Sequence, residues 1–345
     1  MKKFLLFCFL LPQVLHSQNQ AWEFQASKGI GTLIPHTSRI RHLLTGYETP
    51  YALSLFQNKT NTQIFLTYFP SHNPIIGSSW ALTPTHKYFL VKTKHYHFSW
   101  LGGAGIAKIQ NPFNQTTNPK NIAIGTPWNV SILTGFQSKF YWKNWSLGAE
   151  LFAQHASNGS FKKPNLGLNY LNGYLSIGYS FSNPYLNEEK ITPTQPRVSS
   201  PYSTLCAFAN QANLPGGPTS LVVSSQTGWT QMISDKRFFT LGFDLFADGS
   251  NQKTLSNINH QDLPFYKTSQ IGIQLGYGFW GNQKLAAFVQ QGFYLVSFQN
   301  LEGKLYQKIG VRRELSPKIQ FVAALKTHFA QADNLEFGFL YQWKP

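Results

Sequence analysis

The chain has 345 residues, of which 29 are Lys or Arg and 13 are Asp or Glu, so its formal net charge is +16. Only 12% of the residues are charged and 16% are aromatic, and there are 27 Gly and 19 Pro, a composition that argues against a helical bundle. After the first dozen residues no apolar run approaches the roughly 20 residues of a membrane-spanning helix, which excludes a helical membrane span.

The first 17 residues have the layout of a cleaved secretory signal peptide. Lys2 and Lys3 precede an apolar stretch at 4–11, and polar residues follow from Gln18. We expect the mature chain, residues 18–345, to keep one cysteine, Cys206, as a small buried side chain that forms no intrachain disulfide. A basic exported protein suits anionic partners, and the phosphates of lipopolysaccharide are the obvious ones.

Segments of about ten residues with alternating apolar and polar side chains recur along the chain. From Trp145 to His155 the odd-numbered residues are mostly apolar and the even-numbered ones mostly polar or Gly, and 271–277 and 335–343 show the same pattern. Tilted strands of this length cross an outer membrane, with apolar side chains towards lipid and small polar ones towards the lumen. The sequence therefore predicts an all-β fold, an antiparallel transmembrane β-barrel.

The candidate strands form two series, which together number about 14 to 16. The first lies within about 22–182, where the segment 76–93 is long enough for two strands, and the second lies within 201–345. Between them, residues 183–200 contain three prolines and a pair of glutamates, which indicates a connection. We favour one continuous barrel, because a single closed sheet pairs every strand edge in lipid. An eight-stranded barrel followed by a second β region is the alternative.

The segment 155–169 contains the residues with the clearest chemical meaning. His155 and Ser157 continue the odd-numbered apolar face of their strand, so both are expected to point outward. At this spacing they lie about 7 Å apart at Cα, and the imidazole can activate the serine as a general base. Asn169 shares the face of Leu171 on the returning strand and can orient the imidazole. Glu150 has the opposite parity and is expected in the lumen.

This segment resembles the lipid A 3-O-deacylases of the PagL type, also called acyloxyacyl hydrolases. The resemblance rests on His-x-Ser-Asn-Gly at 155–159 and Pro-Asn-x-Gly-x-Asn at 164–169, and it extends over about 22–182. It implies an outer-membrane β-barrel whose serine, paired with a histidine two residues earlier, removes the 3-position acyl chain of lipid A. Residues 201–345 lie beyond the compact members of the family.

The resemblance also implies a role for each residue of the motif. Ser157 is the nucleophile and His155 is its general base. Asn158 and the backbone N–H of Gly159 stabilise the oxyanion. Asn169 stands where the best-known members have a glutamate, and an amide orients a histidine without the full charge that stabilises an imidazolium.

Other candidates are less specific. Lys162 and Lys163 lie in the loop beside the motif, where they either bind lipid A phosphates or are simply solvated. His95 and His97 have the spacing of metal ligands on one strand face, but no third ligand accompanies them, so we expect a polar rim. His36 has no identifiable partner. We predict no metal and no cofactor.

The predicted function is that of a carboxylic ester hydrolase, a serine esterase integral to the bacterial outer membrane that removes an ester-linked acyl chain from lipid A. Its partner is lipopolysaccharide of the outer leaflet, which requires the loop 159–168 to lie on the cell exterior, and no nucleic-acid partner is expected. A non-enzymatic porin or assembly barrel, in which the lumen does the work, is the main alternative. A phospholipase that uses the same serine is a third.

Overall fold

The computed structural model describes residues 22–58, 60–181, 197–213, 217–281, 284–297, 303–328 and 331–343. Within these ranges nearly all regular structure is β-strand, which confirms the all-β prediction. A search of the same residues finds no helix with the length and apolar character to cross a membrane. The expected signal segment at 1–17 and most of the expected connection at 183–200 lie outside the described residues.

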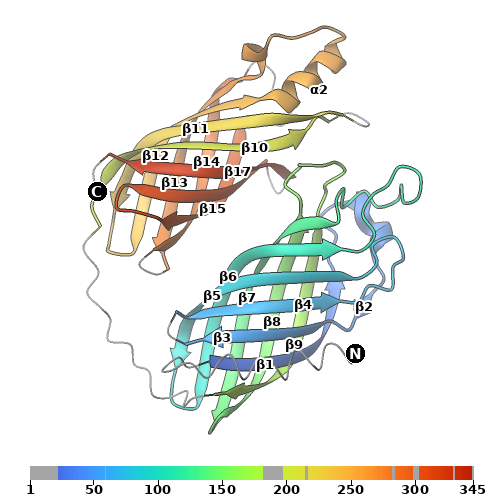
Figure 1. The fold of residues 1–345 in the computed structure, drawn as a ribbon, viewed down its shortest axis with the longest axis vertical. Helices are drawn as coiled ribbons and strands as arrows, with labels where there is room; N and C mark the ends of the chain where they lie inside the picture. Colours follow the sequence, from blue (N-terminus) through green and yellow to red (C-terminus); the bar gives the residue numbers. More distant parts are fainter. Residues whose placement is uncertain are drawn as a thin grey trace. The chain divides into compact units, whose positions relative to one another are not determined.

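The first unit is a closed antiparallel barrel (Figure 1). Consecutive long strands pair with one another, and β1 closes the ring with β9 in a register that runs from Glu23↔Ser180 to Leu33↔Tyr170. The 3-10 helix η1 (Ser38–Leu43) and the two-residue strand β2 (Tyr47–Glu48) follow β1. The eight long strands are β1 (Trp22–Leu33), β3 (Tyr51–Gln57), β4 (Thr62–Phe69), β5 (Ser79–Lys92), β6 (Tyr96–Ile109), β7 (Trp128–Trp142), β8 (Trp145–Ser157) and β9 (Leu168–Ser180).

The second unit is also a closed antiparallel barrel, in which β10 pairs with β17. Helix α2 (Gly249–Asn259) and the 3-10 helix η2 (Phe265–Thr268) connect two of its strands, and the Asp248 carboxylate caps α2 by accepting from Ser250 N. Its strands are β10 (Ser200–Gln211), β11 (Thr219–Met232), β12 (Arg237–Asp248), β13 (Gln270–Trp280), β14 (Leu285–Ser297), β15 (Leu305–Glu314), β16 (Ile319–His328) and β17 (Gln331–Gln342).

The chain therefore does not form the single continuous barrel that we favoured. It follows the alternative, an eight-stranded barrel and a second β region, and this second region is itself closed. Strand alternation indicates where strands lie, but closure depends on pairing between residues far apart in the sequence. The segment 76–93 forms one strand, β5, with a register shift between Phe89 and Val91, and not two strands.

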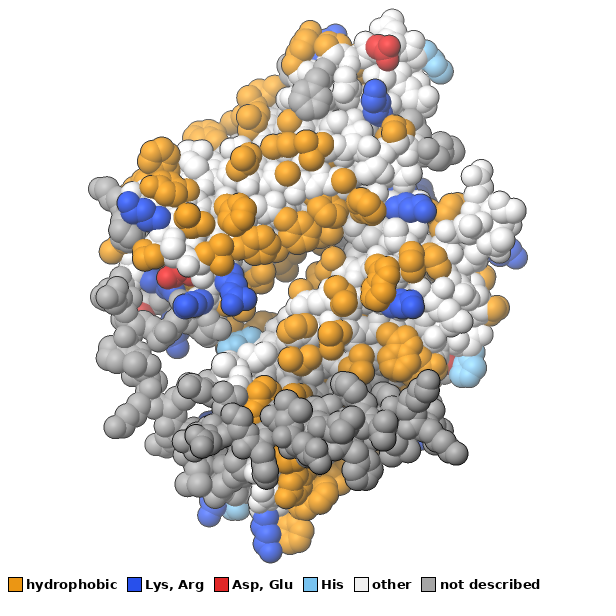
Figure 2. Space-filling view, in the orientation of Figure 1, with side chains coloured by type: hydrophobic (Ala, Val, Ile, Leu, Met, Phe, Trp, Pro, Cys, Tyr) orange, Lys and Arg blue, Asp and Glu red, His pale blue; other side chains and the backbone are white. Residues whose placement is uncertain are grey.

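Side chains alternate between the two faces of each wall as the sequence pattern predicts. In β8, Trp145, Leu147 and Leu151 are exposed, whereas Glu150 and Phe152 are buried inside the barrel. Most of the remaining long strands alternate in the same way, although Asp333–Glu336 of β17 are all buried. Figure 2 shows hydrophobic side chains spread over the outer surfaces of the strands. The outer face is thus apolar and the inner face mainly polar.

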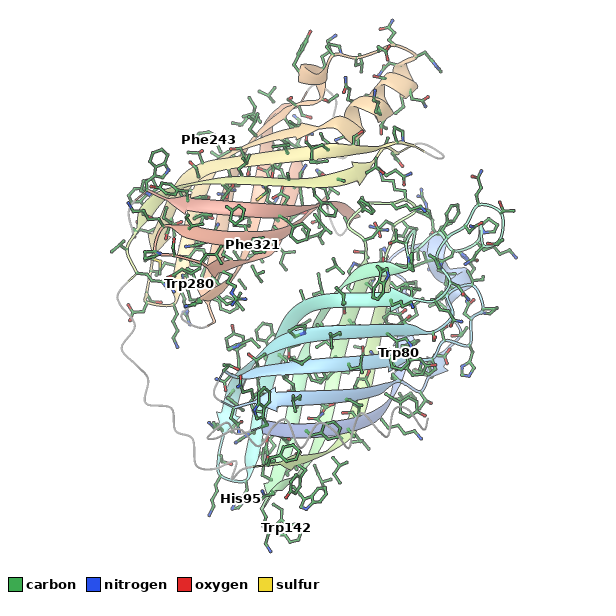
Figure 3. The ribbon with its side chains drawn as sticks, viewed as in Figure 1. Trp80, His95, Trp142, Phe243, Trp280 and Phe321 are labelled. Atoms are coloured by element: carbon green, nitrogen blue, oxygen red, sulfur yellow. The ribbon has the colours of Figure 1, made fainter. Side chains whose placement is uncertain are left out.

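Exposed tryptophans occur at both ends of the first barrel. Trp80 and Trp128 begin β5 and β7 at the end that carries the long connections, whereas Trp142 and Trp145 lie at the opposite end, beside the tight turn between β7 and β8. Figure 3 shows Trp142 and His95 at this turn end. Such rings favour the boundary between an apolar layer and water.

The lumen of the first barrel is filled by polar side chains that bond to one another and by an apolar cluster that includes Phe65 and Phe152. The buried Glu23 carboxylate accepts from Lys139 Nζ and from Ser146 Oγ, each at 2.7 Å. Glu150 points inward, as its parity predicts, and accepts from Ser176 Oγ at 2.7 Å. The interior of an eight-stranded ring is just wide enough for side chains to fill, so these groups take the place of water.

The lumen of the second barrel is filled as well. Lys308 Nζ lies 3.1 Å from a carboxylate oxygen of Asp244 and 3.1 Å from one of Glu336, and Lys326 Nζ lies 2.7 Å from Asp333. The second barrel also contains an apolar core cluster, in which Cys206 is buried as expected: Tyr202, Cys206, Phe238, Trp280, Ala286, Phe288, Val322, Ala324 and Leu340.

Candidate active site

The predicted histidine and serine lie at the end of β8, where the strand leads into the connection at 158–167. β8 pairs with β7 through Ile132↔His155 and Val130↔Ser157 and with β9 through His155↔Asn169. His155 and Asn169 are on the partly exposed faces of their strands, and Ser157 pairs with Val130, which is on the partly exposed face of β7. His155 and Asn169 are half-buried, and Ser157 is buried where the strand meets the loop.

His155 and Asn169 are joined by a side-chain hydrogen bond across the strand pair. Nδ1 of His155 lies 2.6 Å from Oδ1 of Asn169. An amide oxygen can only accept, so the proton is on Nδ1 and Nε2 keeps the lone pair that a general base requires. The amide therefore occupies the place in which a catalytic triad holds its third member.

A second hydrogen bond extends this pair to a histidine for which the sequence offered no role. Nδ2 of Asn169 lies 2.9 Å from Nδ1 of His36, in the connection after β1. The sequence signal that would have found it is parity, because His36 continues the outward, even-numbered positions of β1.

In the part of the chain that the structure describes, no hydrogen bond joins Ser157 to His155. The two residues share the outer face of β8, two positions apart. Catalytic hydrogen bonds are often absent or long without substrate and shorten in the complex. Ser157 lies nearest the loop, followed by His155 on the same strand and by Asn169 opposite His155 on β9.

Gly167 provides the space that the imidazole occupies. A Cβ at this position would lie 2.6 Å from Cε1 and 3.3 Å from Nε2 of His155, and the backbone φ of +80° also favours glycine. The Gly167 N–H donates to the carbonyl of Ala123 at 2.9 Å, which fixes the backbone beside the ring.

The predicted oxyanion residues lie in the loop that follows Ser157. The Asn158 side chain donates from Nδ2 to the carbonyl of Lys162 at 2.8 Å, and its backbone N–H donates to Oδ1 of Asn165 at 2.9 Å. Gly159 has φ +62°, and its Cβ would meet Leu335 Cγ at 2.3 Å, so glycine is required there. The Asn158 amide thus holds the shape of the loop.

Asn165 is a residue of this loop to which the sequence analysis gave no role. Its Oδ1 is occupied by the Asn158 N–H, whereas its Nδ2 is buried and has no hydrogen-bond partner within the described residues. A buried N–H group without an acceptor is uncommon in native structures. The Pro-Asn pair at 164–165 was the available signal.

The two lysines of the loop contribute backbone contacts. Lys162 is exposed, and its carbonyl accepts from Asn158. The backbone N–H of Lys163 donates to Gln211 Oε1 at 2.6 Å. A role for either ammonium group in binding phosphate stays a prediction.

The histidine pair considered as metal ligands lies elsewhere, at the turn end of the barrel. His97 packs against the rings of Phe89 and Tyr141, with centroids 5.1 and 4.6 Å away, and His95 Nδ1 lies 3.3 Å from the carbonyl of Tyr141. A search of the described residues finds no group of three ligands that could hold a metal ion.

The first unit is thus a closed antiparallel β-barrel that carries a serine, a histidine and an asparagine at one end of two neighbouring strands. The family model described as "Lipid A 3-O-deacylase (PagL)" matches residues 44–178, and the model described as "Acyloxyacyl hydrolase, C-terminal domain" matches residues 208–345. The chain therefore belongs to the PagL-type lipid A 3-O-deacylase and acyloxyacyl hydrolase family, as the motif at 155–169 indicated.

Solved structures similar to the chain include outer-membrane channels. An outer membrane channel from Pseudomonas putida F1 is 10% identical, with 94% of this chain and 95% of that chain covered and a TM-score of 0.20. Pseudomonas aeruginosa OpdO is 7% identical, with coverage of 94% and 96% and a TM-score of 0.23. At these TM-scores the likeness carries no argument about this chain. No curated protein matches the chain.

Proposed function

We propose that this chain is a serine esterase of the bacterial outer membrane that removes an ester-linked acyl chain from lipid A. The observation that carries the proposal is the 2.6 Å hydrogen bond between His155 Nδ1 and Asn169 Oδ1 on the outward face of the barrel. It gives His155 the tautomer of a general base two residues from a serine. The family name supports the same substrate class.

The reaction follows from the chemistry of these groups. Ser157 Oγ attacks the ester carbonyl while His155 Nε2 takes its proton. The residues predicted to stabilise the oxyanion are Asn158 and the backbone N–H of Gly159. The proton then passes to the departing lipid A hydroxyl, and water hydrolyses the acyl-enzyme.

The outer wall supports a location in the membrane. Apolar side chains cover the outward face, and exposed tryptophans lie at both ends of the first barrel. The site lies at the end with the long connections, which in outer-membrane barrels face the cell exterior. Lipid A in the outer leaflet then reaches Ser157 by diffusion within the membrane, and Lys162 or Lys163 binds its phosphates.

The filled lumens argue against the porin alternative. Glu23, Lys139 and Glu150 in the first barrel and Lys308 and Lys326 in the second are buried among ion-pair and hydrogen-bond partners. A conducting pore needs an open aqueous path, which eight-stranded rings of this kind do not leave. The outward face is therefore the surface on which chemistry is expected.

The test compares lipid A from cells that express the wild type with lipid A from cells that express Ser157→Ala. Loss of the deacylated species in the variant, seen by mass spectrometry, is the expected result. Ser138→Ala is the matched control, since Ser138 also faces outward but lies on β7 towards the other end of the barrel. Identical lipid A from the wild type and Ser157→Ala would contradict the proposal, and lysophospholipid that depends on Ser157 would favour the phospholipase.

A further inference from the structure

We infer that His36 is a positioning residue of this site, which acts through Asn169 to hold His155 in its catalytic tautomer. Its Nδ1 accepts from Asn169 Nδ2 at 2.9 Å, on the side of the amide opposite the 2.6 Å bond to His155. The inference rests on the proposed function and explains how an amide can serve where a carboxylate is expected.

The orientation of Asn169 decides which nitrogen of His155 carries the proton. With Oδ1 towards His155, Nδ1 is protonated and Nε2 is free to accept the proton of Ser157. Rotation of the amide by half a turn presents Nδ2, a donor, to Nδ1. Nδ1 must then accept, the proton moves to Nε2, and the base on the serine side is lost.

A carboxylate has no such ambiguity, because both of its oxygens accept. An amide needs a second neighbour that distinguishes its two ends. In its Nε2–H tautomer, His36 presents an unprotonated Nδ1, which accepts from Nδ2 and offers nothing to Oδ1. Three groups from three segments of the first barrel thus form one directed chain, from His155 through Asn169 to His36.

The fold fixes His36 on both sides in the sequence. The N–H of Ile34 donates to the carbonyl of Asn169 at 2.8 Å, which extends the β1–β9 ladder one step beyond Leu33↔Tyr170. On the other side Thr37 caps η1 by accepting from the Arg39 N–H. The same strand pairing that closes the barrel therefore brings His36 to the amide of Asn169.

The first test measures deacylation kinetics in purified protein with lipid A as substrate. His36→Ala is expected to lower kcat by about tenfold, which corresponds to about 1.4 kcal/mol, with KM unchanged. His36→Asp, whose carboxylate oxygens can only accept a hydrogen bond, is expected to restore most of the rate. His42→Ala is the control, because His42 lies in the same connection but contacts the carbonyl of Lys120. A wild-type kcat in His36→Ala would overturn the inference.

The second test asks whether His36 acts through the amide. In an Asn169→Asp background the carboxylate needs no orientation, so His36→Ala should then have no effect on kcat. An equal loss in both backgrounds would mean that His36 supports the loop in general, and would overturn the positioning role.

The third test does not depend on lipid A hydrolysis. Nitrogen-15 spectra of labelled His155, recorded in lipid nanodiscs well above the usual histidine pKa, distinguish the two neutral tautomers. The wild type should show the Nδ1–H form and His36→Ala a mixture of both. An unchanged tautomer in His36→Ala would overturn the inference, whereas unchanged lipid A in Ser157→Ala would refute only the proposed function.

Discussion

A methyl group on Gly167 would lie 2.6 Å from Cε1 of His155, which is closer than a real Cβ atom approaches its neighbours. The imidazole is thus confined between the backbone of Gly167 and the amide of Asn169. Because the position of the base depends on this confinement, a change that does not touch the chemical groups themselves should still affect the reaction.

Gly167→Ala should lower kcat/KM for lipid A deacylation by about a hundredfold, because a displacement of about 1 Å at a catalytic group has an effect of that size. Gly46→Ala is the matched control, since Gly46 also has a positive φ, of +87°, but a Cβ there meets nothing within 4 Å. Steady-state kinetics on both variants check the prediction. Equal losses of kcat/KM in the two variants would mean that backbone strain alone causes the effect.

Asn169→Asp should raise kcat by about tenfold or more. The side chain keeps its size, and a carboxylate stabilises the imidazolium that forms when His155 takes the serine proton; the reverse replacement in a serine protease costs about 10⁴ in rate. Asn114→Asp is the control, since Asn114 Oδ1 accepts from two backbone N–H groups and an aspartate can do the same. A slower Asn169→Asp enzyme would contradict the assignment of Asn169 as the orienting group.

Glu23→Gln should lower the free energy of unfolding of the first barrel by about 3–5 kcal/mol, because it leaves the buried Lys139 ammonium without its charged partner. Glu314→Gln breaks the partly exposed pair with Arg197 and should cost about 1 kcal/mol at most. Urea unfolding of protein reconstituted in lipid vesicles measures both. Similar losses of unfolding free energy in Glu23→Gln and Glu314→Gln would mean that water reaches the lumen around Glu23.

Leu241→Arg should make the free energy of folding into lipid vesicles less favourable by about 2–4 kcal/mol. This is the cost of an arginine on the lipid face near the midplane of a barrel. Leu241 is 55% exposed in the middle of β12. Leu315 is 57% exposed but lies in the turn after β15, so Leu315→Arg should have little effect. The fraction of folded protein in each preparation, read from heat-dependent gel mobility, provides the comparison.

Alternation predicted the walls of both barrels because it is a local property. The outward positions of Leu147 and Leu151 and the inward position of Glu150 follow from the period of a strand. The division into two rings does not follow from the strand period. Nothing in the local sequence of β1 favours pairing with β9 over pairing with the last strand of the chain. The register of β1 with β9, from Glu23↔Ser180 to Leu33↔Tyr170, and the pairing of β10 with β17 distinguish the two possibilities.

The same difference explains which parts of the site the sequence revealed. His155 and Asn169 lie on strands joined by one connection, so their pairing could be predicted. His36 meets Asn169 only because β1 closes with β9, and in a single large ring it would have stood beside another strand. The engagement of the Asn158 amide with the Lys162 carbonyl depends on how the loop folds, which no periodicity describes.

The closure of β1 on β9 also bears on biogenesis. Every ladder of the first ring is complete within residues 22–180, so its assembly does not have to wait for strands that are synthesised later. A nascent or truncated chain that ends after β9 already contains all the edges needed to seal that ring in a bilayer.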